Sequence, residues 1–457
     1  MARPDKNNML SGPLLPGIIR YSIPLMLIGI LQLLFNAADL VVVGRYCGSI
    51  SVAAVGATGA ITQLIVNLFI GISAGAGVTV AQAIGAKDDE MVHRAVHTAI
   101  PTALIGGVIL MAVGIPLAPT LLTWMDTPES VLPLSSTYMR IYFSGMVFNM
   151  LYNFSASILR AAGDTGSPLR HLTIAGVLNV LLNLFFVIVL DMDVAGVALA
   201  TILSQGYSAA ALLLVLAGRT DACRLHVGGI RLYKGPLLKM LRIGIPAGIQ
   251  ASIYSIANVL LQSSYNGFGD IAMRGIAAAR TIEGFIYAAI NSFCQATINF
   301  VGQNVGAKQY RRVRKVYWTS LGCSAGLGVL LGGAAILLSE PLLSIYITDS
   351  AEAIAYGAER MLIMCGTYFI CGLLDVTNGA IRGTGVSVPP MVVSLVGIIA
   401  LRIGLVLTVF QIPAYHTLPM LYAAVPISWL GTLILQCIVF AWVCRNKLRE
   451  VPEQAQT

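Results

Sequence analysis

Long apolar stretches follow one another along the chain, and short segments between them hold most of the charged residues. A helix that crosses a bilayer needs about 20 mainly apolar residues. We predict twelve transmembrane helices, at 16–44, 51–80, 94–118, 133–158, 168–191, 194–217, 236–263, 271–300, 314–338, 355–380, 388–411 and 418–443. The pattern therefore predicts an all-α integral membrane protein.

The sequence repeats itself at a spacing of about half its 457 residues. The segment QAIGAK, beginning at Gln82, returns as QNVGAK at Gln303, and Pro24 is matched by Pro246. Such a spacing indicates two repeats in the same orientation, a plan found in transporters. The predicted parts are an N-lobe at 1–217, a linker at 218–235, a C-lobe at 236–445 and a tail at 446–457.

Composition and charge agree with a chain that lies in lipid. Apolar residues make up 57% and charged residues 11%, whereas a soluble domain has about 25% charged residues. The net charge of +8 could attract nucleic acid, but the Lys and Arg residues gather in alternate loops between apolar stretches. By the positive-inside rule this pattern predicts cytoplasmic termini and a cytoplasmic linker. We therefore expect the bilayer, and no nucleic acid, as a partner.

Motifs for enzymatic chemistry are missing or lie in the wrong context. No HExxH or Walker sequence occurs, the eight cysteines form no CxxC pair, and we expect them to be reduced. The GISAG segment, Gly71 to Gly75, matches a nucleophile motif but lies within an apolar helix, where small residues pack helices closely. His93 and His97 have a metal-ligand spacing, with Glu90 one turn earlier. We interpret them as the solvated start of a helix, and predict neither a metal site nor an enzyme.

The first apolar stretch is too long for a signal peptide and has no small-residue cleavage site. We therefore expect it to be a membrane span.

Three carboxylates lie inside predicted spans, where ionisable side chains are costly and usually functional. They are Asp39, Glu283 and Asp375. Asp39 could instead cap a helix near the surface, and Asp375 could have a structural role. Glu283 could form a structural ion pair with Arg280 or with Arg402. Both readings stay open for each carboxylate.

Polar side chains on other spans can be grouped around Asp39: Asn179 and Asn183, which share a helix face, Thr201 and Tyr138. Taken singly, these amides could simply join helices. Aromatic rings attract organic cations. Candidates for a substrate cavity are Asn36, Tyr142, Asn149, Tyr254, Gln262, Tyr287, Asn291, Tyr368 and Asn378, although helix packing would also account for most of them.

Several motifs give the chain a family resemblance. They are the duplicated QxxGAK segments, the spacing of Pro24, Asp39 and Gly44, and the LRAAGDTGSP loop after the fourth span. The chain resembles the multidrug and toxic compound extrusion (MATE) family over about 12–445, and is closer to its MepA-like and DinF-like branches than to its NorM-like branch. The resemblance implies two six-helix lobes related by a pseudo-two-fold axis. It also implies a central cavity and a place in the bacterial cytoplasmic (inner) membrane.

The resemblance implies roles for residues of the N-lobe. Asp39 matches the carboxylate that the family uses for cation coupling, and Pro24 matches the proline at which the first helix bends. The polar companions of the carboxylate match Asn179, Asn183, Thr201 and Tyr138. At Asn183 the sequence departs from some members of the family, which have a second aspartate there.

In the C-lobe the match is partial. Asp375 matches an aspartate of the NorM-like branch, but the glutamate of that branch falls near Tyr254 here. Glu283 could replace it, so Asp375 and Glu283 form a candidate second cation site.

The resemblance implies a secondary active multidrug transporter. We expect it to export cationic and amphipathic small molecules by alternating access, in antiport with H⁺ or Na⁺. We expect no cofactor, a monomer, and no metal other than Na⁺ bound transiently at Asp39. The alternative is a flippase for a lipid-linked precursor, from the same broader superfamily.

Overall fold

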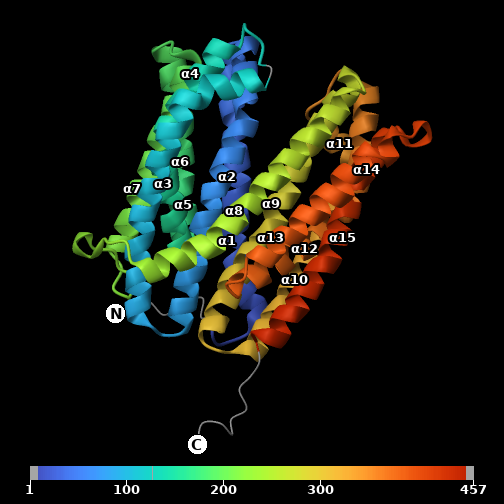
Figure 1. Cartoon of the computed structure of the whole chain (residues 1–457). Helices are drawn as coiled ribbons and strands as arrows, with labels where there is room; N and C mark the ends of the chain where they lie inside the picture. The colour runs from blue at the N-terminus through green and yellow to red at the C-terminus, as the bar shows by residue number, and fades with distance from the viewer. Residues whose placement is uncertain (1–8, 126, 449–457) are drawn as a thin grey trace, which may run out of the picture. The chain divides into compact units, whose positions relative to one another are not determined.

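The computed structural model describes residues 9–125 and 127–448, and the described residues form helices and connecting loops without a β-strand (Figure 1). The first repeat contains α1 Leu14–Tyr46, α2 Ser49–Gly85, α3 Asp89–Trp124, α4 Leu132–Ser144, α5 Met146–Ala161, α6 Gly166–Leu184, a π-helical turn Phe185–Val189 and α7 Asp193–Ala217. The second contains α8 Lys234–Asn266, α9 Asp270–Gly306, α10 Tyr310–Leu337, α11 Ser339–Ser344, α12 Ala351–Gly383, α13 Val388–Val396, a π-helical stretch Gly397–Ile403, α14 Gly404–Leu407 and α15 Leu418–Asn446. Between the repeats lies a 3₁₀ turn, Val227–Gly229, and two more, Val409–Gln411 and Pro413–Tyr415, precede α15.

Each predicted span has a helical counterpart, which confirms the all-α class. Ten of the described helices are long and apolar enough to cross a membrane. The fourth span is divided at Gly145 into α4 and α5, and α9 is less apolar because it carries residues such as Glu283 and Asn291. Of the predicted tail, residues 449–457 lie outside the described part of the chain.

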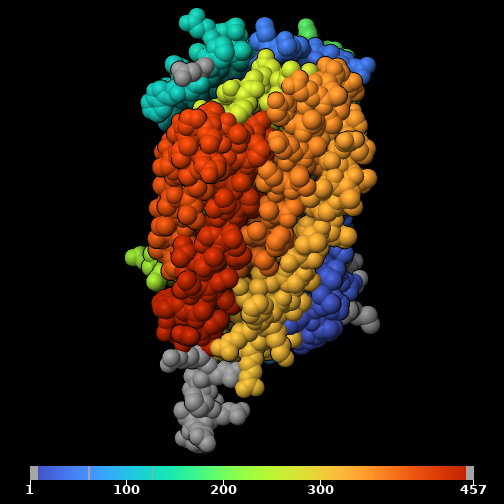
Figure 2. All heavy atoms as spheres, turned by 90° about the vertical axis from the view of Figure 1, so that its right-hand side faces the viewer, coloured from blue at the N-terminus to red at the C-terminus, as the bar shows by residue number. Residues whose placement is uncertain are grey.

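The side chains at the surface of these helices fit a lipid environment. On α15, which lies on the face shown in Figure 2, the exposed large side chains before the basic last turn are apolar. They include Ile427, Leu430, Ile434, Ile438 and Trp442. Apolar side chains at this density would be costly in water but are favourable against acyl chains.

The backbone confirms the duplication. Lys87 and Lys308, 221 positions apart, both have a left-handed conformation, with φ of 55° and 56°. Gly48 and Gly269 also lie 221 positions apart, with φ of 90° and 87°. A positive φ is uncommon for a residue with a side chain, so its recurrence at the repeat spacing indicates the same turn in both halves.

Contacts divide the chain into two compact units, Ile30–Ser252 in one and Met1–Gly29 with Ile253–Thr457 in the other. The first part of α1 belongs to the C-terminal unit, where the rings of Tyr21 and Phe300 meet edge to face with centroids 5.6 Å apart. The division thus falls inside α1 and α8, and the predicted lobe boundaries at 217 and 236 stay predictions.

Within the N-terminal unit, α2 and α8 approach each other through glycines. A Cβ atom added to Gly71 would lie 2.2 Å from the backbone N of Gly248, and one added to Gly75 would lie 2.3 Å from the carbonyl O of Met240. Gly244 has the same close relation to Ile72. The GISAG segment therefore packs two helices backbone to backbone, as predicted, and is no nucleophile elbow.

We expect Gly71→Ala to destabilise the N-terminal unit by about 1–3 kcal/mol, because the added methyl group overpacks the seam. The apparent melting temperature of the purified protein in detergent measures this effect. Gly333→Ala is the matched control, since a Cβ there meets no atom within 4 Å. In an open helical position, alanine should be neutral or stabilising by up to about 1 kcal/mol. Equal melting temperatures for the two variants would contradict the seam.

Candidate cation and substrate site

A cavity of about 560 Å³ lies inside the N-terminal unit, between α1, α2, α4, α5, α6 and α7. Asp39 lies at its wall and is the one formally charged residue among the described residues that line it. The remaining wall is formed by aromatic, amide, hydroxyl and apolar side chains. A carboxylate in such surroundings is chemically suited to bind a single cation.

A chain of hydrogen bonds connects Asp39 to two other helices. Asn183 donates from Nδ2 to Oδ1 of Asp39 at 2.5 Å and to Oδ1 of Asn179 at 3.3 Å. Asn179 in turn donates to Oγ1 of Thr201 at 3.5 Å, and Thr201 donates to the carbonyl O of Val197 at 3.0 Å. The structure thus brings together four of the five residues predicted for the coupling site.

The fifth, Tyr138, lines the same cavity from α4. Its ring is stacked near that of Tyr142, with the centroids 6.2 Å apart. The predicted cavity residues Asn36, Tyr142 and Asn149 also lie in the wall. This pair of aromatic rings adds a surface that attracts organic cations to the side of the carboxylate.

The geometry of the site follows from helix periodicity. Asn179 and Asn183 are four residues apart on α6, so their amides lie one above the other on a single face. Asp39 is held opposite them because the ring of Phe35, one turn earlier on α1, packs directly on Gly176. A Cβ at Gly176 would lie 1.8 Å from that ring, so glycine is required for the approach of α1 to α6.

A buried acceptor beside Asp39 has no hydrogen-bond partner. Asn183 is 0% exposed, and its Oδ1 is unpartnered although its Nδ2 donates twice. An unpaired buried acceptor is costly, and it would be satisfied by a proton donor or by a metal ion. Carboxylate, amide and hydroxyl oxygens are the donor set that hard cations such as Na⁺ prefer.

Several polar residues of the wall were not predicted from the sequence. They are Gln32, Thr58, Thr62, Gln63, Asn67, Tyr152, Asn153, Ser204, Gln205 and Ser208. The four-residue spacing of Gln63 and Asn67 within a predicted span was a usable signal, since it places two amides on one helix face.

The two carboxylates predicted to form a second cation site, Glu283 and Asp375, have different partners in the structure. Glu283 accepts two hydrogen bonds from Arg360, at 2.7 and 2.9 Å, and both side chains are 5% exposed. Asp375 instead lies 3.5 Å from Nδ2 of Asn291, which is eight residues, or about 12 Å of helix, beyond Glu283 on α9. A cation site shared by these two carboxylates therefore stays a prediction.

Glu283 does form an ion pair, which was the alternative prediction, but its partner is neither Arg280 nor Arg402. Arg280 donates to Oε1 of Gln262 at 2.5 Å. Arg402 donates to Ser428 at 3.0 Å and to Asn258 at 3.5 Å. Arg360 is the actual partner, and its guanidinium also lies over two aromatic rings (those of Tyr265 and Tyr422), 5.5 and 5.2 Å from their centroids.

The remaining substrate-cavity candidates belong to the C-terminal unit. Tyr368 is 7% exposed and packs against Trp429, with ring centroids 5.4 Å apart, so it is a core residue rather than a lining residue. Gln262 is occupied by Arg280 and Asn266. For Tyr254, Tyr287, Asn291 and Asn378 a role in binding stays a prediction.

Known proteins share the sequence features and the architecture of this chain. The MatE family model matches residues 24–185 and 246–408, one segment in each repeat. The probable multidrug resistance proteins YoeA and YpnP of Bacillus subtilis (strain 168) are 27% identical over 444 residues and 28% identical over 396 residues. These alignments cover 93% of this chain and 93% of YoeA, and 86% of this chain and 87% of YpnP.

Among solved structures, a MOP superfamily transporter from Pyrococcus furiosus has the same fold with a TM-score of 0.90, at 20% identity over 98% of this chain and 99% of that one. A crystal structure of a MATE protein in a bent conformation matches with a TM-score of 0.86 over 98% of both chains. These matches confirm the predicted two-lobed helical membrane fold. Since the family model covers most of both repeats, the chain belongs to the MatE family.

Proposed function

We propose that the protein is a secondary active exporter of cationic and amphipathic small molecules, driven by the entry of H⁺ or Na⁺ through alternating access. The observation that carries this proposal is Asp39, the single formal charge among the described residues of a polar and aromatic cavity. The relatives named as probable multidrug resistance proteins support the same reading.

Competition for one carboxylate would couple the two movements. An organic cation would bind between Asp39 and the rings of Tyr138 and Tyr142, where charge attraction and cation–π contacts act together. An incoming H⁺ or Na⁺ would neutralise Asp39 and remove the charge that holds the substrate. The chain would therefore carry the drug or the ion in each half cycle, but not both.

Asn183 would assist either ion. Its amide donates a hydrogen bond to Asp39, which would favour an ionised carboxylate. Rotation of the amide would present Oδ1 instead, which accepts a hydrogen bond from a protonated Asp39 or binds Na⁺. The buried Oδ1 would then gain the partner that it lacks here.

The driving force is sufficient without ATP. Exchange of one monovalent organic cation for one H⁺ or Na⁺ moves no net charge, so the concentration gradient of the ion would drive it. A tenfold gradient, about 1.4 kcal/mol, would support a tenfold accumulation of the drug. We further propose that the transporter is monomeric and crosses the bacterial cytoplasmic membrane several times, with both termini in the cytoplasm. Pro24 would be the point at which α1 bends.

A flippase is the second candidate, and the cavity of the N-terminal unit does not favour it. A lipid-linked diphosphate needs cationic side chains, and neither Lys nor Arg occurs among the described residues of that wall. Asp39 would repel such a headgroup.

Transport in proteoliposomes tests the proposed function. Protein in the inside-out orientation is supplied outside with a fluorescent phenanthridinium cation, and the lumen is made either acidic or rich in Na⁺. We expect the cation to accumulate under one of these gradients and not in protein-free vesicles. Accumulation that is equal with and without both gradients would contradict secondary active antiport.

The same vesicles test whether the protein acts as a flippase instead. A fluorescent polyprenyl diphosphate is placed in the outer leaflet, and its protection from a membrane-impermeant quencher is followed. We expect no protein-dependent protection. Protection of the lipid, without any accumulation of the cation, would show that the protein is a flippase and not an exporter.

A further inference from the structure

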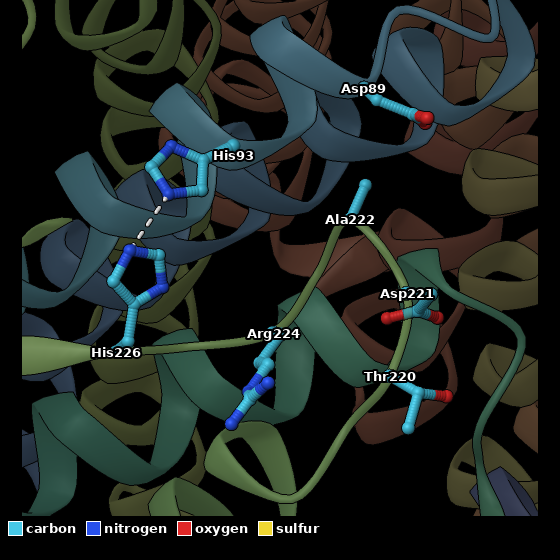
Figure 3. Close-up of a pocket in the computed structure, with 7 residues that line it drawn as sticks. All are labelled: Asp89, His93, Thr220, Asp221, Ala222, Arg224 and His226. Atoms are coloured by element: carbon cyan, nitrogen blue, oxygen red, sulfur yellow. Dashed lines mark hydrogen bonds between the residues drawn. The ribbon is translucent and has the colours of Figure 1, made fainter.

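Three of the five histidines of the chain gather at one place outside the cavity. His93 and His97 lie on the first turns of α3, and His226 comes from the linker between α7 and α8. One ligand atom from each lies within 4.8 Å of the others. Figure 3 shows the imidazoles of His93 and His226 facing each other across the gap between helix and linker. The sequence spacing revealed only the first two of these residues.

The separation of two ring nitrogens fits metal ligation better than a hydrogen bond. Nε2 of His93 and Nε2 of His226 are 3.4 Å apart, longer than the usual 2.7–3.2 Å of a hydrogen bond. Two nitrogens that bind Zn²⁺ at 2.0–2.1 Å in tetrahedral geometry lie about 3.3–3.4 Å apart. When both nitrogens present a lone pair, this distance places them well for a shared cation.

His97 has the orientation of a metal ligand with its supporting hydrogen bond. Its Nδ1 lies 2.8 Å from the carbonyl O of His93, so the proton is on Nδ1 and the lone pair is on Nε2. Imidazole ligands of zinc typically donate their second N–H to a backbone carbonyl in this way. Nε2 now accepts the backbone N–H of His226 at 3.2 Å, a contact that a metal ion would replace.

The linker is fitted closely around this cluster. A Cβ on Gly229 would lie 2.8 Å from Nε2 of His97 and 3.0 Å from Nε2 of His226. Beside the histidines, a cavity of about 700 Å³ is lined by Asp89 of α3 and by linker residues that include Asp221. A water molecule in this cavity would complete the fourth coordination position from that side.

The charged form of Asp221, which lies beside the cluster, is favoured by its partner. Burial opposes ionisation of Asp221, but the hydrogen bond and the charge of Arg219 outweigh it, so that the pKa of Asp221 is lowered. The carboxylates of Asp89 and Asp221 offset the positive charge of Arg224 at the same cavity. The surroundings are thus compatible with a bound divalent cation.

We propose that His93, His97 and His226 bind Zn²⁺, or a similar divalent transition metal, in a site that fastens the linker to α3. Imidazole nitrogens favour Zn²⁺ over Mg²⁺ and Ca²⁺, which prefer oxygen ligands. The site lies within the N-terminal unit and is separate from the cavity that contains Asp39. It stands whether or not the protein exports drugs.

Cobalt absorption tests the site directly. Full-length protein, purified with a tag that contains no histidine and stripped with a chelator, is titrated with Co²⁺. We expect the intense visible bands of a tetrahedral ion, abolished by an equal concentration of Zn²⁺. His226→Asn should weaken Co²⁺ binding by about 10- to 100-fold or more. Loss of a residue that only supports a metal ligand already has an effect of this size, and His226 would itself be a ligand. His171→Asn and His416→Asn, which alter the two histidines outside the cluster, should leave binding unchanged.

Two further variants distinguish the loss of a metal ligand from misfolding of the protein. His226→Cys retains a metal ligand and should restore binding, with a new sulfur-to-cobalt absorption in the near ultraviolet. Gly229→Ala keeps all three histidines but should weaken binding, because its methyl group occupies the space beside them. Trypsin provides an independent readout, since the linker contains Arg224 and Arg231 and should be cut more slowly with Zn²⁺ than with chelator.

The outcomes are distinct. Weak absorption typical of an octahedral ion, unchanged in His226→Asn, would overturn the proposal. So would tetrahedral absorption that is lost equally in His171→Asn. Loss of binding in His226→Asn and recovery in His226→Cys would establish the site.

Discussion

Asparagine at position 39 is expected to abolish gradient-driven export while the protein remains folded. Asp39→Asn retains the shape of the side chain and an oxygen that can accept the hydrogen bond from Asn183. It removes the only formal charge among the described residues of the cavity, and with it the group that H⁺ or Na⁺ would neutralise. Accumulation of an organic cation should fall to the level of protein-free vesicles.

Binding should weaken as well, by about tenfold, which corresponds to about 1.4 kcal/mol. Fluorescence anisotropy of the phenanthridinium probe in detergent measures this change, and thermal melting of the same sample shows that the variant is folded. Asp375→Asn is the matched control, because it makes the same substitution in the C-terminal unit. We expect this control to export at more than half the rate of the unmodified protein.

The reverse pattern would relocate the coupling site. If Asp39→Asn exported normally and Asp375→Asn did not, Asp375 with Asn291 would be the ion-binding pair. Loss of export in both variants would mean that the two units each contribute a carboxylate to the cycle.

The two repeats have diverged at these positions, which explains why their sites differ. A spacing of 222 places Leu261 opposite Asp39, and Asn153 opposite Asp375. Each carboxylate therefore has an uncharged counterpart in the other half. The shared backbone turns at Lys87 and Lys308 show that the fold was retained while the charged positions changed.

Local periodicity was sufficient to predict the site around Asp39. An ionisable residue in an apolar stretch, and two asparagines four positions apart, both restrict which helix faces turn inward. The spans could be predicted from the length and hydropathy of each apolar stretch, because both are properties of a single segment of the chain.

Partners between helices could not be predicted in this way. Arg360 lies 77 positions from Glu283, and Arg280 is closer in sequence, so the choice depends on how α9 and α12 are rotated. His226 lies 133 positions from His93, in a loop without periodicity. Such pairings are decided by tertiary packing, of which a single sequence gives no direct signal.

Replacement of Arg360 by methionine is expected to be among the most destabilising single changes in the chain. Arg360 and Glu283 are both 5% exposed and are joined by two hydrogen bonds. Arg360→Met would leave the charge of Glu283 buried without a partner, at a cost of about 3–5 kcal/mol. The apparent melting temperature in detergent should fall by about 6–20 °C, since 1 kcal/mol shifts it by about 2–4 °C in a large domain.

The control is an exposed ion pair of the same unit. Arg274 and Asp349 are paired with 48% and 63% of their side chains exposed, and solvent screening leaves such exposed pairs with little effect on stability. Arg274→Met should therefore change the melting temperature by no more than a few degrees. A similar loss in Arg274→Met and Arg360→Met would show that burial of the pair is not the cause.

The double variant separates stability from function. Glu283→Leu combined with Arg360→Met removes both charges and should recover most of the lost stability, because a buried pair gains little over apolar side chains of similar volume. If Glu283 serves only to neutralise Arg360, this variant also exports the organic cation. A stable double variant without export would show instead that Glu283 takes part in coupling, and that its pairing with Arg360 is one state of a working site.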